Sequence, residues 1–211
     1  MDALLTLPQI SAFLVAAVLI TLAPGPDNLM VLSLGVARGR EAGIAFGLGC
    51  ALGCLSHTAL AALGISALIA ASAGAFAALK IAGGLYLVWL GIQALKNARP
   101  LGATAPDLPA ESAKKLFAKG LIANAINPKV ILFFLAFLPQ FVAAGRGGAA
   151  WQTAQLGAVF TLQAALIFGA IGGFAGGVGA WLTRRPQAGT WLDRLAGGIF
   201  VLIGLKLIAA R

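Results

Sequence analysis

The chain has 211 residues, of which 60% are hydrophobic and only 10% charged, and its mean hydropathy is +0.96. A soluble domain carries roughly 25% charged residues, so this composition excludes an ordinary soluble domain and indicates an integral protein of the lipid bilayer. A net charge of +9 would suit nucleic acid in a soluble protein. In a membrane protein it indicates basic loops retained in the cytoplasm, and we expect no nucleic-acid partner.

Six apolar stretches follow one another along the chain. Each is long enough to cross about 30 Å of hydrocarbon. They run approximately over 9–35, 41–70, 74–96, 118–143, 150–182 and 190–209. The sequence therefore predicts an all-α membrane protein with six transmembrane helices, in a single transmembrane domain that covers residues 1–211.

Positive residues predict the orientation of these helices, because basic loops stay in the cytoplasm. With the amino terminus outside, ten lysine and arginine residues lie inside and four outside, while Lys129 lies within an apolar stretch. We therefore expect both termini to face outward. The polar stretch at about 97–119, the one sizeable loop, is then cytoplasmic.

An internal repeat divides the chain into two halves. Ala82-Gly83-Gly84-Leu85-Tyr86 resembles Ala196-Gly197-Gly198-Ile199-Phe200, and each segment is followed by a further glycine and a lysine. Clusters of helix breakers in the first and fourth stretches add a second correspondence. Because each half has three helices, the halves must run in opposite directions, which predicts a 3+3 inverted repeat of about 9–97 and 118–211. Chance recurrence in a chain with 28 glycines is the alternative.

The first cluster of helix breakers is Pro24-Gly25-Pro26-Asp27-Asn28. The two prolines lack an N–H, so one helix should stop around Ala23 and another restart after Pro26. Free N–H groups around Asn28 and Leu29 would attract a carboxylate, while Asp27 would hold an ammonium group or a proton. The cluster therefore suits a zwitterion, and the alternative is a proline kink whose polar residues cap the helix.

The second cluster comprises Asn124 and Asn127-Pro128-Lys129. Asn127 is placed as an N-cap and Pro128 as the first helical residue, which predicts that the fourth span is also broken. Lys129 is costly at that depth unless it finds a partner or water. It could bind a carboxylate, pair with Asp27, or snorkel to the cytoplasmic interface.

Three residues of the second stretch could carry chemistry. Cys50, Cys54 and His57 follow i, i+4, i+7 spacing and share one helix face. They would suit a soft metal, although buried cysteine also behaves as a small hydrophobic residue. His57 alone could relay protons. In the fifth stretch Gln163, with Thr161, could add uncharged hydrogen bonds.

Glycines at four-residue spacing predict smooth helix faces that pack closely or slide, or that form a homodimer contact. They are Gly43/Gly47, Gly49/Gly53, Gly169/Gly173/Gly177 and Gly172/Gly176.

Several motifs together resemble the LysE/RhtB family of bacterial amino-acid exporters over nearly the whole chain. They are Pro-Gly-Pro at 24–26 with Asp27-Asn28, Arg38-Gly39-Arg40-Glu41-Ala42-Gly43, Asn127-Pro128-Lys129, Phe133-Phe134 and Leu138-Pro139-Gln140-Phe141. The resemblance implies a multi-pass transporter of the bacterial cytoplasmic (inner) membrane, not an enzyme, with no cofactor and no resident metal. Its substrate would be threonine, homoserine, leucine or a related amino acid, exported in exchange for protons.

One position departs from the family's pattern. Several members place a carboxylate in the fifth helix, where this chain has Gln163-Ala164. A proton or cation role of that carboxylate would then pass to Asp27 or His57. Two other functions remain open at this point: divalent heavy-metal efflux through Cys50, Cys54 and His57, and a membrane thiol oxidoreductase that uses the two cysteines.

Overall fold

The computed structural model describes residues 4–23, 25–71, 73–98, 111–143, 146, 148–185 and 187–209. All regular structure in these ranges is helical, as the sequence predicts. The elements are α1 (Leu7–Leu22), α2 (Pro26–Arg38), α3 (Arg40–Ala71), α4 (Ala73–Lys96), α5 (Ala113–Ala125), α6 (Pro128–Leu132), the π-helical η1 (Phe133–Phe137), the 3₁₀-helical η2 (Leu138–Phe141), α7 (Ala149–Gly173), α8 (Ala175–Arg184) and α9 (Gln187–Ala209).

The described residues hold two to four candidate membrane spans. Arg40–Gly64 of α3 and the whole of α7 are each long and apolar enough to cross a bilayer. Two further candidates are bent pairs: α1 with α2, bent by 58°, and α5 with the run Pro128–Phe141, bent by 49°. The two bends fall at the predicted breaks in the first and fourth stretches, which confirms the breaks. The count of six spans stays a prediction.

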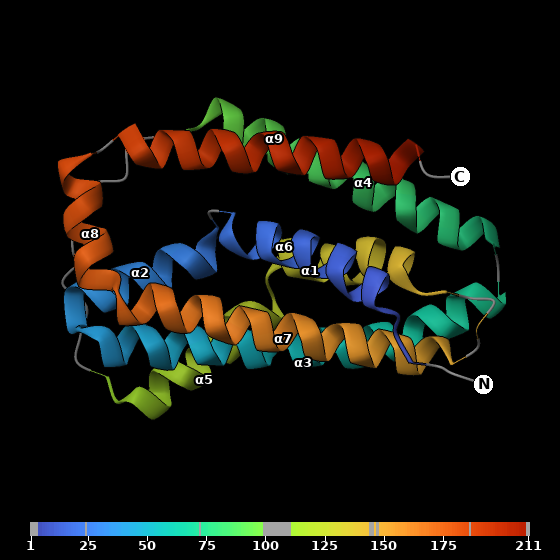
Figure 1. The fold of residues 1–211 in the computed structure, drawn as a ribbon, viewed down its shortest axis with the longest axis horizontal. Helices are drawn as coiled ribbons and strands as arrows, with labels where there is room; N and C mark the ends of the chain where they lie inside the picture. The colour runs from blue at the N-terminus through green and yellow to red at the C-terminus, as the bar shows by residue number, and fades with distance from the viewer. Residues whose placement is uncertain are drawn as a thin grey trace.

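The helices form three tiers (Figure 1). α3, α5 and α7 make one side, α4 and α9 pair on the opposite side, and α1, α2 and α6 lie between them. α1 begins and α9 ends at the same end of the long axis, while the α2–α3 junction, the start of α5 and α8 lie at the other end. Which end faces the cytoplasm stays a prediction.

Glycines let the backbones of α3, α5 and α7 approach closely. A Cβ added to Gly49 would collide with the carbonyl oxygen of Phe117 on α5, and one added to Gly47 would lie 2.9 Å from the Cβ of Phe168 on α7. The predicted smooth face of α3 is thus confirmed. On α7 Gly169 makes no close helix contact within the described chain, because nothing described lies within 4 Å of its added Cβ, and a homodimer contact there stays a prediction.

Close packing is confirmed for Gly172, another of the predicted glycines, because its added Cβ would lie 2.5 Å from the backbone nitrogen of Ile44. Gly173 has only an ordinary contact at 3.8 Å with Ile44, and Gly176 and Gly177, now on α8, have no described atom within 4 Å. The fifth apolar stretch was predicted to continue to residue 182, but α7 ends at Gly173. Consecutive glycines at 172 and 173 favour helix ends because glycine loses most conformational entropy in a helix.

The α4–α9 pair shows an internal correspondence. A Cβ on Gly91 would lie 2.6 Å from the Gly197 carbonyl oxygen, and one on Gly197 would lie 2.7 Å from that of Gly91. Gly84 and Gly204 make the same reciprocal contact, at 2.9 and 2.6 Å. Gly84 and Gly91 of α4 have the same spacing as Gly197 and Gly204 of α9. If Gly84 is matched with Gly197 and Gly91 with Gly204, each of the two contacts corresponds to the other. This match between α4 and α9 is offset by one residue from the alignment that places one Ala-Gly-Gly motif directly on the other.

The polar loop ends earlier than its predicted boundary at residue 119. α5 already begins at Ala113, with Ser112 as its N-cap, and residues 99–110 lie outside the described part of the chain. The lysines that suggested a loop instead form ion pairs: Lys115 and Lys119 contact the Glu111 carboxylate at 2.8 and 2.7 Å. These hydrogen bonds lower the pKa of Glu111 to about 2. Arg38, at the end of α2, donates to the carbonyl of Glu111 at 2.7 Å.

Two alanine substitutions on α7 test the close crossing with α3. Gly172→Ala should lower the free energy of unfolding by about 1–3 kcal/mol, as overpacking does. Gly169→Ala, on the same helix, should keep the stability or raise it by up to about 1 kcal/mol, since alanine favours a helix more than glycine. Thermal unfolding of the two purified variants in detergent measures the difference, and equal melting temperatures would contradict the crossing.

Candidate functional site

The carbonyl end of α1 is satisfied by side chains rather than by the next turn of helix. In a continuous helix the carbonyl of Ile20 would accept from the N–H of residue 24. Residue 24 is Pro24, which has no N–H and lies outside the described residues. The Nζ of Lys129 donates instead to the carbonyls of Ile20, at 3.2 Å, and of Ala23, at 3.0 Å. Asn28 donates from Nδ2 to the carbonyl of Thr21 at 2.7 Å.

α2 begins as predicted, except that one of the backbone N–H groups expected to be free forms a hydrogen bond. Gly25 is the N-cap and Pro26 the first helical residue, with no side chain capping the end. The N–H of Leu29 was expected to be free, but it donates to the carbonyl of Gly25 at 3.0 Å. Leu29 is the fourth helical residue and already closes the first turn, so the open positions belong to Asp27 and Asn28.

A buried hydrogen bond joins the two breaks. The Nδ2 of Asn124, at the end of α5, donates to Oδ2 of Asp27 at 2.8 Å. The backbone carbonyl of Asn124 accepts from Nε2 of His57 at 3.0 Å, and its Oδ1 accepts from the thiol of Cys54 at 3.4 Å. All four side chains are buried. The structure therefore gathers Asp27, Asn124 and His57, which the sequence proposed separately.

The second break forms as predicted at Asn127 and Pro128. Pro128 is the first residue of α6, and Oδ1 of Asn127 accepts from the backbone N–H of Lys129 at 3.0 Å. The side chain of Lys129 is 8% exposed and turned toward α1. Snorkelling is therefore wrong for this conformation, and the ammonium contacts the carbonyls of α1 rather than the Asp27 carboxylate. The unpaired carbonyl end of α1 explains this direction.

Cys50, Cys54 and His57 share one buried face of α3, which confirms the spacing argument. Both cysteines are free thiols. Within the described part of the chain, no three histidine, cysteine or acidic residues are grouped as metal ligands. The polar atoms of Cys54 and His57 are directed to Asn124 instead, so these contacts give no support to the metal-efflux or thiol-oxidoreductase alternatives.

A side chain of the fifth apolar stretch, which forms α7, also contacts the first break. Nε2 of Gln163 donates to the hydroxyl of Thr21 at 2.8 Å. Oε1 of Gln163 and the hydroxyl of Thr161 are buried without a hydrogen-bond partner among the described residues. The sequence reading missed Thr21, although a hydroxyl within an apolar stretch, three residues before Pro24, was a signal for it.

A small closed cavity lies between the two breaks. Its volume is about 20 Å³, and its lining includes Ile20, Thr21, Asp27, Asn124 and Lys129. A cavity of this size holds about one water molecule. The cavity is therefore too small to hold an amino acid.

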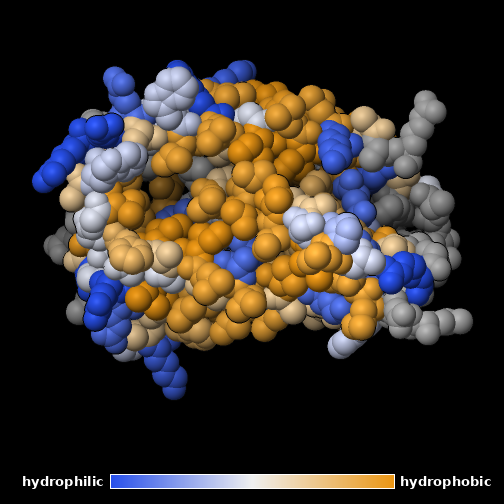
Figure 2. Space-filling model, in the orientation of Figure 1, coloured by the Kyte–Doolittle hydropathy of each residue, from blue (hydrophilic) through white to orange (hydrophobic). Residues whose placement is uncertain are grey.

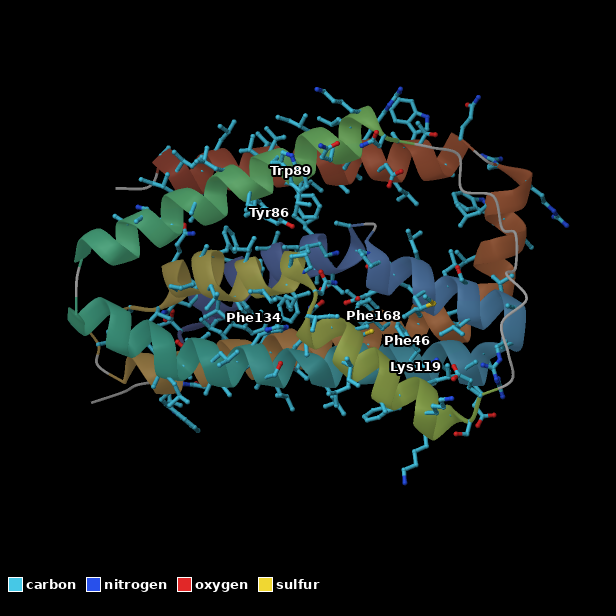
Figure 3. The ribbon with its side chains drawn as sticks, turned by 180° about the vertical axis from the view of Figure 1, so that it is seen from behind. Phe46, Tyr86, Trp89, Lys119, Phe134 and Phe168 are labelled. Carbon is cyan, nitrogen blue, oxygen red and sulfur yellow. The ribbon has the colours of Figure 1, made fainter. Side chains whose placement is uncertain are left out.

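Aromatic side chains cover this cavity. Phe133, Phe160 and Phe168 line it, and the rings of Phe133 and Phe160 lie 5.1 Å apart. Phe134 continues the cluster, 5.7 Å from the ring of His57, and Figure 3 shows Phe134 and Phe168 directed into the bundle. The sequence identified Phe133-Phe134 only as part of a motif, and no local pattern marked Phe160 or Phe168.

A second hollow lies on the other side of the first break. It measures about 310 Å³ and opens between α9 and α2, near α8 (Figure 2). Its walls are almost wholly apolar and come from α1, α2, α7, α8 and α9, with Asn28 as the polar side chain among them. Oδ1 of Asn28 is buried and has no partner among the described residues. The first break therefore lies between the small cavity, which Asp27, Asn124 and Lys129 line, and this larger apolar one.

Comparisons with known proteins cover almost the whole chain. A family model described as "LysE type translocator" matches residues 18–211. An uncharacterized membrane protein of Vibrio cholerae is 35% identical over 95% of this chain and 96% of its own length. The threonine efflux protein of Escherichia coli K12 is 32% identical, covering 90% and 92%. The homoserine/homoserine lactone efflux protein of Salmonella typhimurium is 30% identical, covering 95% and 96%. No solved structure matches.

The buried amide of Asn124 should be important for stability. Asn124→Leu keeps the volume but removes the donor to Asp27, which leaves a buried carboxylate unpaired, and should lower the free energy of unfolding by about 2–3 kcal/mol. Asn97→Leu is the control, because Asn97 is exposed and bonds only Gln93 in the described structure. Thermal unfolding in detergent compares them, and an unchanged melting temperature for Asn124→Leu would show that the two breaks are not held together by this bond.

Proposed function

Because the chain belongs to the LysE-type translocator family, we propose that it is a secondary active exporter that moves an amino acid, or an amino-acid derivative, out of the cytoplasm in exchange for protons. The chain is a membrane transporter and not an enzyme. Relatives named as threonine and homoserine efflux proteins support amino-acid export. Relatives described as membrane proteins and the apolar helices agree with the predicted place in the bacterial cytoplasmic membrane.

The proposed architecture is six spans in a 3+3 inverted repeat. α1–α2, α3 and α4 form the first half, and α5 with α6 to η2, α7 with α8, and α9 form the second. The two bent pairs and the reciprocal glycine contacts between α4 and α9 support this division. Both termini outside remains the proposed orientation. A homodimer stays a prediction from the glycine spacing.

The observation that carries the proposed site is the 2.8 Å hydrogen bond between Asn124 and Asp27. It brings the broken helices of the two halves together where half-helix ends offer charge to a zwitterion. The N–H groups of Asp27 and Asn28 suit the substrate carboxylate, and the Asp27 carboxylate suits its ammonium group. The first break is set by Gly25 and Pro26, and the second by Asn127 and Pro128. The closed cavity represents the occluded conformation, and the halves rock to open it on either side.

In this proposal, amino-acid export is coupled to proton import because a proton and the substrate's ammonium group compete for the Asp27 carboxylate. A protonated Asp27 is neutral and holds an ammonium group weakly, so a proton and the substrate exclude each other at this residue. Asn124, which donates to Asp27 through its side chain, also accepts a hydrogen bond from His57 through its backbone carbonyl. Asp27 is therefore the proposed coupling site with His57 as its relay. Gln163, which contacts Thr21, takes a hydrogen-bonding part in place of a carboxylate.

Transport by inside-out membrane vesicles tests this function. Labelled amino acids, including threonine, homoserine and leucine, should accumulate when the vesicle interior is acidic, and accumulation should collapse when the gradient is dissipated. Asp27→Asn should reduce gradient-driven uptake at least about tenfold, since a loss of about 1.4 kcal/mol or more in the driving interaction is expected. Glu41→Gln, at the exposed start of α3, is the control.

Two outcomes would contradict the proposal. The absence of uptake for every amino acid, with the protein present in the membrane, would remove the function. Uptake by Asp27→Asn that still responds to the gradient as the parent does would leave the function and remove the coupling site.

A further inference from the structure

The carbonyl end of α1 has the chemistry of an ammonium site. Lys129 donates from Nζ to the carbonyls of Ile20 and Ala23 at 3.2 and 3.0 Å. Neither carbonyl has a helical partner, because Pro24 lacks an N–H and α1 has ended before residue 27. The end of a helix also carries partial negative charge, which favours a cation. The two carbonyls form a small cradle for one primary ammonium group.

Gly25 lies against the ammonium group in this cradle. A Cβ on Gly25 would lie 2.9 Å from Nζ of Lys129 and 3.4 Å from its Cε, so the end of the lysine chain would have to shift to make room for it. The small cavity adjoins it, with Asp27 and Thr21 among its lining residues. The lysine side chain is buried with the cradle.

Among the described residues the hydrogen-bond acceptors of the Lys129 ammonium are neutral, so another primary ammonium group can make the same two bonds. The described hydrogen bonds of Lys129 go to two backbone carbonyls, and only the donor of these bonds is charged. A carboxylate adds a full negative charge on the acceptor, so it is a stronger partner for the ammonium than either carbonyl. The carboxylate of an arriving zwitterion is such a partner. The positive start of α2 lies beside Gly25 and draws the same carboxylate to this place.

We propose that this cradle is the substrate's ammonium subsite and that Lys129 is its built-in occupant. The arriving ammonium group takes over the carbonyls of Ile20 and Ala23 while it faces the Asp27 carboxylate, which lines the same small cavity, and the displaced Lys129 pairs with the substrate carboxylate. The site then selects compounds with a free primary ammonium group next to a carboxylate and rejects N-acylated ones. This assignment rests on the proposed export function, and it adds the class of substrate and the role of Lys129.

Removing the occupant should open the cradle to a free amine. Lys129→Ala, purified in detergent, should melt at a lower temperature than the parent and regain stability in a saturable way as ethylammonium chloride is added. Tetramethylammonium chloride at equal concentration controls for ionic strength and should have no such effect, because it has no N–H donor. The parent and Lys114→Ala, a variant of an exposed lysine on α5, should respond equally little to both salts. Equal effects of the two salts on Lys129→Ala would overturn the proposal.

Gly25→Ala provides a second test through a double-mutant comparison. The added Cβ should lower the melting temperature when Lys129 is present and have little further effect in Lys129→Ala, because the group it meets is then gone. The same loss in both backgrounds would show that the ammonium does not occupy the cradle.

Competition in the parent protein tests the substrate class without any variant. Excess unlabelled amino acid should block uptake of a labelled one into inside-out vesicles, whereas its N-acetyl derivative should not. Equal inhibition by the N-acetyl derivative would contradict an ammonium subsite. A protein that transports no amino acid but still binds ethylammonium in Lys129→Ala would refute the export function and leave the cradle in place.

Discussion

The need to satisfy backbone carbonyls in hydrocarbon dominates this structure. Each unpaired peptide group there costs several kcal/mol, so a helix broken within the membrane needs partners from elsewhere. At the end of α1 those partners are the ammonium of Lys129 and the amide of Asn28. Since Lys129 comes from the other half of the chain, satisfying one break fixes the position of the second.

The close helix crossings follow from the same requirement. Short polar groups reach a helix end only when the backbones lie near one another, and glycine on α3 permits this. A Cβ on Gly53 would lie 2.8 Å from the Cβ of Asn124, so this glycine admits the asparagine that bonds Asp27, Cys54 and His57. The smooth face of α3 therefore positions the polar network and does more than pack helices.

Sequence determines the two breaks almost to the residue, because their causes are local. Proline lacks an N–H wherever it stands, so Pro26 and Pro128 begin helices as predicted. The direction of Lys129 could not be predicted, since a long flexible side chain bonds whichever carbonyls tertiary packing brings within reach. Phe160 and Phe168 were missed for the same reason: their role depends on how α7 faces the breaks, which no local pattern records.

Several polar atoms around the breaks have no hydrogen-bond partner in the described residues. Oδ1 of Asn28, Nδ2 of Asn127 and Oε1 of Gln163 are all buried around the breaks. A buried unsatisfied group costs about 1–3 kcal/mol, so these atoms raise the free energy of this conformation relative to one in which they are satisfied. Two of them are acceptors and one is a donor. A zwitterion supplies ammonium donors and carboxylate acceptors together, so under the proposed function its binding would satisfy unpartnered atoms of both kinds.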